Sequence, residues 1–394
     1  AGGKMVEDLI KKLTGKNKND YETAAGELAN NCDIELFKEL VENDGYLFDF
    51  VKQNVAERLE KVINENNYKN LLEFLKYYSP SYEDVIVTSL VKYADEDLTD
   101  EMLNKLESGT VEEKTYAARY FAYVQDPLAL DALRTNSHSE SDYLTANCAS
   151  TLAVMNDKES YNVAITGLNN GDDFEKLSAV KFLVAYGSKD ALPSIIETMK
   201  TSAMAENIAG EIPYLENLFE LLENNYEDGL LTLNYIINGL GEILDLSLVF
   251  DFELFEVLEK LINNHDDSKA AIVLLNAKEK FDTLTENDEY LFDVDKDTKN
   301  EIQDIKKLLK NVNRKELETH INEELNENSP FVYTALDFAT DLIAIRELLK
   351  SNNQTVILKT AEILKSLGNL DETAKTVALL KVTDINIKSI IRAL

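Results

Sequence analysis

Apolar residues along this chain recur three and four positions apart, the spacing that places side chains on one face of an α-helix. After Asp157, and again after Ser188, the residues four, seven, eight and eleven positions further on are apolar. They are Tyr161, Ala164, Ile165 and Leu168 in the first case, and Leu192, Ile195, Ile196 and Met199 in the second. After Asp126 the same pattern begins at Leu130 and Leu133, but Arg134 and Ser137 break it. This part of the chain is therefore predicted to form helices with one apolar face.

The helical pattern repeats along the first half of the chain, with a small or apolar residue followed eight positions later by a polar one. The pairs are Ala25/Asp33, Ala56/Asn64, Ser89/Asp97, Ala118/Asp126, Ala149/Asp157 and Val180/Ser188, with first members 31, 33, 29, 31 and 31 residues apart. A small side chain lets helices approach closely, and Asp, Asn or Ser caps the helix that follows. The spacing predicts an array of about six helix pairs over residues 5–206, with a later echo at Ala361/Asn369.

From residue 207 onward the helical periodicity continues, but the length of the unit becomes irregular. Helices are predicted over 211–223, 229–244, 252–263, 269–281, 301–309 and 384–394, with a further pair opening at Ser329-Pro330. A polar, acidic segment covers 282–299. We interpret 207–394 as a divergent helical continuation of the array, with a boundary near 285–300. A separately folded C-terminal helical module is the alternative.

Family resemblance rests on Ala117-Ala118 before Asp126-Pro127, and on Ala179-Val180 before Ala191-Leu192-Pro193. In these residues the chain resembles the HEAT-repeat family, specifically the short bacterial HEAT-like repeats of phycobilisome lyases. The resemblance is good over 110–200, looser over 20–109 and weak beyond 200. It implies an all-α fold, a right-handed α-α superhelix of stacked antiparallel helix pairs. Lysine replaces the arginine that is common in this family, which argues against an arginine–aspartate pair within a repeat.

The resemblance also implies where a partner binds, because the second helices of HEAT arrays line a concave surface. Residues six, nine and ten positions after each break then face a protein or peptide partner. In the best-aligned units these candidate partner-binding residues are Ala132, Thr135, Val163, Thr166, Ser194, Glu197 and Thr198.

The composition supports a helical fold and narrows the classes of partner. Only 14 Gly and 5 Pro occur in 394 residues, too few for a fold with many tight turns. A formal net charge of −33 with no basic stripe argues against nucleic acid and anionic membranes as partners. A basic protein partner fits this charge, although the charge also serves simply to keep a large surface soluble. No secretory signal or bilayer-length apolar run is found, which predicts a cytoplasmic protein.

Side chains that carry chemistry do not form a recognisable constellation. His138, His265 and His320 have no second histidine at metal-ligand spacing, and no phosphate-binding glycine loop is found, so neither a metal nor a cofactor is expected. Asp293-Val294-Asp295-Lys296-Asp297 resembles the start of a calcium loop. Position six is Thr298 and position twelve is Asp304, so an acidic helix start is the preferred interpretation. A catalytic site assembled from distant parts of the chain stays an open alternative.

Cysteines, charged pairs and tyrosines are assigned structural roles. Cys32 and Cys148 lie far apart beside small residues, which predicts buried thiols instead of a disulfide framework. Glu112-Glu113 and Glu323-Glu324 are predicted to lie on solvated helix faces, with Thr110 and Glu113 forming a capping box. The aromatic residues around Tyr77-Tyr78, Tyr116–Tyr123 and Phe250–Phe255 are expected to fill the seams between helices, with a tyrosine at the surface available as a binding anchor.

These observations favour a non-enzymatic protein-binding scaffold or adaptor that uses the concave surface of the array. The first alternative is a chromophore-handling protein like the phycobilin lyases, which only the resemblance suggests. The second is an acidic decoy for a basic nucleic-acid-binding protein, which the net charge suggests.

Overall fold

A computed structural model of the chain describes residues 2–15, 17–30, 40, 43, 46–241, 245–264, 267–287 and 294–394. Within these ranges the regular elements are helices and there is no strand, so the predicted all-α class is confirmed. The chain divides into two compact units. Unit 1 comprises residues 1–198 with 291–295, and unit 2 comprises residues 199–290 with 296–394. None of the helices in the described ranges is long and apolar enough to cross a membrane.

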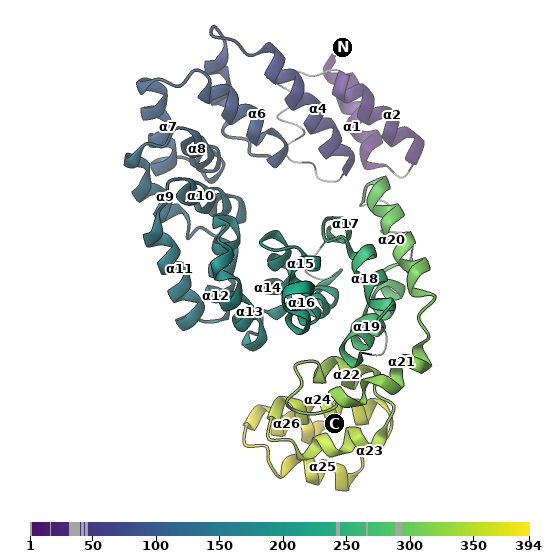
Figure 1. The fold of residues 1–394 in the computed structure, drawn as a ribbon. Coiled ribbons are helices and arrows are strands. Elements are labelled where there is room, and N and C mark those ends of the chain that lie inside the picture. The colour runs from purple at the N-terminus through teal and green to yellow at the C-terminus, as the bar shows by residue number, and fades with distance from the viewer. Residues whose placement is uncertain are drawn as a thin grey trace. The chain divides into compact units, whose positions relative to one another are not determined.

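Unit 1 is a stack of helix pairs (Figure 1). Its first helices are α4 (Tyr46–Val62), α6 (Pro80–Val91), α8 (Val111–Tyr123), α10 (Asp142–Val154) and α12 (Asp173–Tyr186). Each first helix packs against the next, and α2 (Lys18–Asn30), preceded by α1 (Gly2–Thr14), packs against α4. The second helices α7 (Glu96–Ser108), α9 (Leu130–Asn136) and α11 (Lys158–Asn170) each pack against the first helix of the following pair. This layered stacking is the arrangement of an α-helical solenoid.

Short elements complete the pairs of unit 1. They are η1 (Tyr68–Asn70) and α5 (Leu71–Phe74) after α4, η2 (Pro127–Ala129) before α9, and η3 (Lys189–Ala191) before α13 (Leu192–Thr201). Proline begins α6 and η2, where its missing N–H costs no hydrogen bond.

The repeat of unit 1 is more regular in the structure than in the sequence prediction. The predicted pair Ser89/Asp97 is wrong by two residues, because the side chain that caps α7 is that of Asp95, which accepts from the backbone N–H of Leu98 at 2.8 Å. Its buried counterpart is therefore Val87. With this correction the polar residues Asn64, Asp95, Asp126, Asp157 and Ser188 follow one another at intervals of 31 residues. The matching residues Ala56, Val87, Ala118, Ala149 and Val180 are all buried; Asp33, in the first predicted pair, lies outside the described residues.

Helix ends in unit 1 repeat at the same interval. Thr110, Ser141 and Asp172 cap α8, α10 and α12, and each accepts from a backbone N–H three residues further on. Thr110 and Glu113 form the predicted capping box. Each cap satisfies a backbone donor at the helix start and is worth about 1 kcal/mol, so the repeated polar residues stabilise successive pairs separately.

The late echo at Ala361/Asn369 shares the helix ending found in unit 1. Residue 368 is a glycine at φ +71°, and Asn369 donates its backbone N–H to the Leu364 carbonyl at 2.8 Å. Asp157 donates in the same way to the Leu152 carbonyl at 2.9 Å, after Asn156 at φ +56°. Both endings place a left-handed residue after the helix, which satisfies carbonyls that the helix leaves unpaired.

Unit 2 is built from helices of unequal length. They are α14 (Ala205–Glu211), η4 (Ile212–Tyr214), α15 (Leu218–Asn224), α16 (Tyr226–Gly239), α17 (Leu248–Asp251), α18 (Leu254–Ile262), α19 (Ser268–Leu284), α20 (Lys296–Leu309), α21 (Arg314–His320), η6 (Ile321–Glu324), α22 (Val332–Phe338), α23 (Leu342–Glu347), η7 (Leu348–Lys350), α24 (Gln354–Ser366), α25 (Glu372–Leu379) and α26 (Ile385–Ala393). The helices α14, α16, α19, α22, α24 and α26 each pack on the next. The helix predicted over 211–223 is wrong in one respect: it is interrupted around Pro213, and Asn217 caps a new helix.

A buried amide network joins three helices of unit 2. Asn276 on α19 donates to the side-chain carbonyls of Asn234 and Asn238 on α16, at 3.0 and 2.7 Å. Asn234 in turn donates to the hydroxyl of Thr334 on α22 at 2.9 Å. Because buried amides are costly when unpaired, this network favours one register of the three helices.

Candidate binding site

A pocket of about 540 Å³ opens in unit 1 between α11, α12 and the loop that joins α9 to α10. Its apolar lining comes from Val163 and Ala164 on α11 and from Phe174, Ala179 and Phe182 on α12. Its charged and ionisable lining comes from the loop and the helix ends, and consists of Arg134, His138, Asp142, Glu159, Glu175 and Lys181. The pocket therefore combines an apolar wall with a polar rim.

Small residues on the two helices create the depth of the pocket. Gly167 on α11 faces Ala179 on α12, and a Cβ atom at position 167 would lie 3.4 Å from the Cβ of Ala179. Large side chains at either position would fill the space. Further along α12, Phe182 is only 5% exposed and its ring stacks on that of Tyr186, with the centroids 5.9 Å apart.

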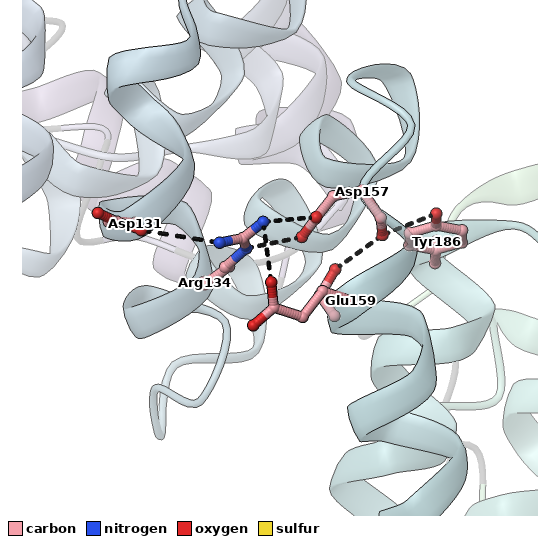
Figure 2. A network of polar contacts seen from close by, with 6 residues as sticks. Asp131, Arg134, Asp157, Glu159 and Tyr186 are labelled. Atoms are coloured by element: carbon pink, nitrogen blue, oxygen red, sulfur yellow. Dashed lines mark hydrogen bonds and ion pairs between the residues drawn. The ribbon is translucent and has the colours of Figure 1, made fainter.

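An arginine network lies beside the pocket (Figure 2). Arg134, at the end of α9, donates to both carboxylate oxygens of Asp157 at 2.7 and 2.9 Å. The same guanidinium lies 3.4 Å from Glu159 and 3.7 Å from Asp131. The side chain of Asp157 is 7% exposed and that of Arg134 is 32% exposed. Two parallel hydrogen bonds to a buried carboxylate are the strongest form of this ion pair.

The network ties three successive helix pairs together. Asp157 is the residue just before α11, and its carboxylate bonds Arg134 instead of capping that helix. Its backbone carbonyl accepts from the hydroxyl of Tyr186 on α12 at 3.0 Å and from the Ser160 hydroxyl at 3.2 Å (Figure 2). The hydrogen bonds from Arg134 hold the pKa of the Asp157 carboxyl below its usual range, although its burial acts in the opposite direction. Helices α9, α11 and α12 are therefore coupled next to the pocket.

Sequence reasoning missed this network. Arg134 occupies position eight after Asp126, where the next two units carry Ile165 and Ile196, and it was interpreted only as a break in the apolar stripe. A signal was present, since a charge at a core position of a helix needs a buried partner. Asp157, at the break of the next unit, is that partner. The resulting pair joins two successive repeats.

A second ion pair lies on the other side of the pocket. Lys181 on α12 is 3.3 Å from both carboxylate oxygens of Asp142 at the start of α10. The Asp142 side chain is 75% exposed, so this pair is much more solvated than the one between Arg134 and Asp157. Together the two pairs neutralise the two cations of the lining.

The structure places the seven predicted partner-binding residues on three second helices, and only Val163 among them lines the pocket. Thr135, Thr166 and Glu197 are exposed, and Ala132 and Ser194 are half-buried. Thr198 is 8% exposed and donates its hydroxyl to the Ser194 carbonyl at 2.8 Å. Thr198 is therefore buried and is not available on the surface as predicted.

A carboxylate and three tyrosines form a separate cluster on the first helices. Glu83 on α6 accepts from the hydroxyl of Tyr78 at 2.9 Å and from the side-chain amide of Asn147 on α10. The ring of Tyr78 packs on Tyr116 and Tyr143, with centroids 5.1 and 5.2 Å away. Burial raises the pKa of the Glu83 carboxyl, even though both hydrogen bonds lower it. The hydrogen bonds and ring contacts of this cluster link α6 to α8 and α10, which is a structural role.

Two glutamates predicted to be solvated are buried instead. Glu113 is 9% exposed and accepts from Lys105 of α7 at 2.8 Å. Glu324 is 5% exposed and accepts from Ser268 and Ser329, both at 2.9 Å. Both predictions were wrong because partners from another helix or loop make the burial of a carboxylate affordable.

The remaining sequence predictions concern thiols and metal ligands. Cys148 is a buried free thiol, as predicted, and burial raises its pKa. Asp297 lies in the first turn of α20, as an acidic helix start requires. Cys32, His265 and Asp293 lie outside the described residues. Within the described ranges, no group of three or more His, Cys, Asp and Glu side chains is placed to hold a metal ion.

Comparison of the sequence with known protein families finds no match, and comparison with curated proteins finds none either.

Proposed function

We propose that this chain is a non-enzymatic scaffold of HEAT-type repeats that binds a protein or peptide partner at the pocket between α11 and α12. The observation that carries this proposal is the exposure of apolar side chains at the opening of the pocket, which we call its mouth. Phe174 is 72% exposed and Val163 is 51% exposed, one on each of the two helices. Exposed apolar side chains around a concavity are typical of interaction sites, because a partner removes them from water.

The rigidity of the surroundings supports binding. Arg134 joins α9 to α11, and Tyr186 joins α12 to the same residue, Asp157. A preorganised pocket loses less conformational entropy when it is filled, so more of the contact energy appears as affinity. The two cations of the lining, Arg134 and Lys181, are used in ion pairs that hold helices together.

The class of partner and the location follow from charge and thiol chemistry. A net charge of −33 opposes nucleic acid and anionic membranes and suits a protein partner that carries basic residues. The free thiol of Cys148 suits a reducing compartment, and we propose the cytoplasm.

One observation favours a second candidate function, the handling of a chromophore such as a bilin. The pocket volume of about 540 Å³ falls within the range of roughly 300–1,000 Å³ that small-molecule sites occupy. Incubation of the chain with a bilin tests this function directly. A shifted absorbance band that Gly167→Leu abolishes would favour it over the scaffold.

The test of the scaffold is affinity capture from the source organism with three forms of the chain. These are the unaltered protein, a Val163→Ala/Phe174→Ala variant and a Leu128→Ala variant, each checked by circular dichroism. Leu128 is the matched control, because it is an apolar residue of unit 1 with 70% exposure that does not line the pocket. We expect a partner, identified by mass spectrometry, whose capture falls for the pocket variant alone. Equal capture by all three forms overturns the proposal for this pocket.

The predicted concave face is tested separately with Glu197→Lys and Thr166→Trp. Both residues are exposed on second helices outside the pocket lining. Loss of capture in these variants extends the site along the second helices. Unchanged capture confines the site to the pocket.

A further inference from the structure

The pocket is apolar inside, and two apolar side chains also stand exposed at its otherwise polar rim. Phe182 lies within it, almost fully buried, and Val163 and Phe174 stand exposed at its edge. Exposure of a phenylalanine at 72% leaves most of its apolar surface in water. A large apolar side chain that enters from a partner would contact the two phenyl rings and the methyl groups of Val163 at once. The floor of small residues at Gly167 and Ala179 leaves room for it.

The charge around this mouth is unbalanced toward the negative. The lining contains two cations, Arg134 and Lys181, and three carboxylates, Asp142, Glu159 and Glu175. Arg134 is engaged by Asp157 and Glu159, and Lys181 by Asp142. Glu175 forms no ion pair with any residue that the structure describes, and it is exposed. It directly follows Phe174 in the chain, so an unpaired carboxylate stands beside the apolar mouth.

We propose that the pocket takes a segment of a protein partner in which one large apolar side chain is flanked by lysine or arginine. This rests on the proposed scaffold function and specifies its partner. The apolar side chain packs against Phe182 between Val163 and Phe174, and the neighbouring cation pairs with Glu175. Both cations of the lining are already neutralised, so an acidic or phosphorylated segment finds no free positive charge and meets a repelling carboxylate.

The proposal is tested with three short fluorescein-labelled peptides and the full chain, by fluorescence anisotropy. The first peptide carries one Phe flanked by two Lys on each side in a Gly-Ser background. The second has Ala in place of Phe, and the third has Glu in place of each Lys. We expect the first to bind more tightly than the second by roughly 10-fold, because burial of a phenylalanine side chain is worth about that factor or more. We expect no binding of the third.

Variants of the chain locate the contact. Phe174→Ala is expected to weaken the first peptide by about 5- to 10-fold. Glu175→Lys is expected to weaken it by roughly 5-fold and to reduce its salt dependence, as for a solvated ion pair. The matched controls are Leu128→Ala and Glu112→Lys, since Leu128 is as exposed as Phe174 and Glu112 is likewise an exposed glutamate in the first turn of a helix. Neither control is expected to change the affinity.

The possible results separate this inference from the scaffold proposal. Equal binding of the Phe and Ala peptides, or an equal loss in Glu112→Lys and Glu175→Lys, overturns it, because attraction to the acidic surface in general then explains the binding. No peptide binding, together with capture of a partner that depends on Phe174, also overturns this inference but leaves the scaffold standing. If substitution of Phe174 changes neither peptide binding nor capture of a partner, both proposals are wrong.

Discussion

The ion pair between Arg134 and Asp157 provides a quantitative test of how the repeats are held together. Substitution of Arg134 with methionine keeps much of the aliphatic stem and removes the guanidinium, so packing changes little. It leaves the Asp157 carboxylate, 7% exposed, without the donors at 2.7 and 2.9 Å. Removal of one partner from a fully buried pair costs about 3–5 kcal/mol, and from an exposed pair about 0–1 kcal/mol. Because the Arg134 side chain is 32% exposed, we expect a loss of about 2 kcal/mol.

The assay is urea unfolding followed by fluorescence. The chain contains no Trp, so a Tyr161→Trp background, used for every variant, places a single probe on α11 beside Tyr186, whose ring centroid lies 5.5 Å from that of Tyr161. With an m-value of about 2 kcal/mol/M, Arg134→Met is expected to lower the midpoint by about 1 M. Lys181→Met is the control, since its partner carboxylate is 75% exposed, and its loss should stay below about 0.5 kcal/mol.

Two further measurements decide whether the unpaired carboxylate is the cause. Asp157→Asn added to Arg134→Met should recover about 1 kcal/mol, because it removes the buried charge that has lost its partner and keeps a side chain of nearly the same size. The pKa of Asp157 is lowered in the folded protein, so its stabilisation is present above the unfolded value near 3.9 and is lost as the pH falls through the folded value. The difference between the unaltered protein and Arg134→Met should therefore shrink from pH 7 to pH 3. No recovery in the double variant, or a difference that is constant with pH, refutes this reasoning.

Three other predictions concern burial and backbone conformation. Burial raises the pKa of Glu83, so ionisation of this carboxyl destabilises the folded protein increasingly as the pH rises toward the pKa of the folded state. The stability of Glu83→Gln relative to the unaltered protein should therefore increase from pH 4 to pH 7. A difference in stability that does not change with pH contradicts this prediction. Asn276→Ala should destabilise unit 2 by about 2 kcal/mol because two amide carbonyls lose their donor. Exposed Asn224→Ala should cost less than about 0.5 kcal/mol in the same measurement, a urea titration followed by circular dichroism. Gly187→Ala should destabilise the protein by about 1 kcal/mol because φ is +84°, although no atom lies within 4 Å of the new Cβ. Gly26→Ala inside α2 should instead stabilise it by about 1 kcal/mol. If both variants shift the temperature of thermal unfolding in the same direction, the explanation by backbone conformation is wrong.

Structural features that depend on residues close together in the sequence were predictable. The helices of unit 1, the capping box at Thr110 and the interval between Ala118, Ala149 and Val180 all follow from residues within a few positions of one another. The shift at Ser89/Asp97 shows the limit of this approach. Asp95 and Asp97 are equally good caps in sequence, and the structure shows that Asp95 is the cap and that Val87, eight residues earlier, is buried.

The candidate site was predictable only in part. The position of Val163 six residues after Asp157 predicted that it lies on an outward face of its helix. The structure puts this residue, 51% exposed, at the mouth of the pocket. Phe174 and Glu175 were not predicted, because they belong to a first helix, and the resemblance directs attention to second helices. Their position beside Val163 depends on how closely α11 approaches α12, which Gly167 and Ala179 permit.

The amino-acid sequence by itself determined that the chain is helical, where most helices begin, and that apolar stripes recur with a period that only stacking can bury. These properties depend on interactions over three to eight residues, which one stretch of sequence contains completely. The tertiary structure alone decided that Arg134 pairs with Asp157, that Glu113 and Glu324 are buried, and that an apolar pocket with an unpaired carboxylate opens between two helices. Each of these depends on which side chains of separate helices meet and how much water is left between them, and no local pattern specifies that.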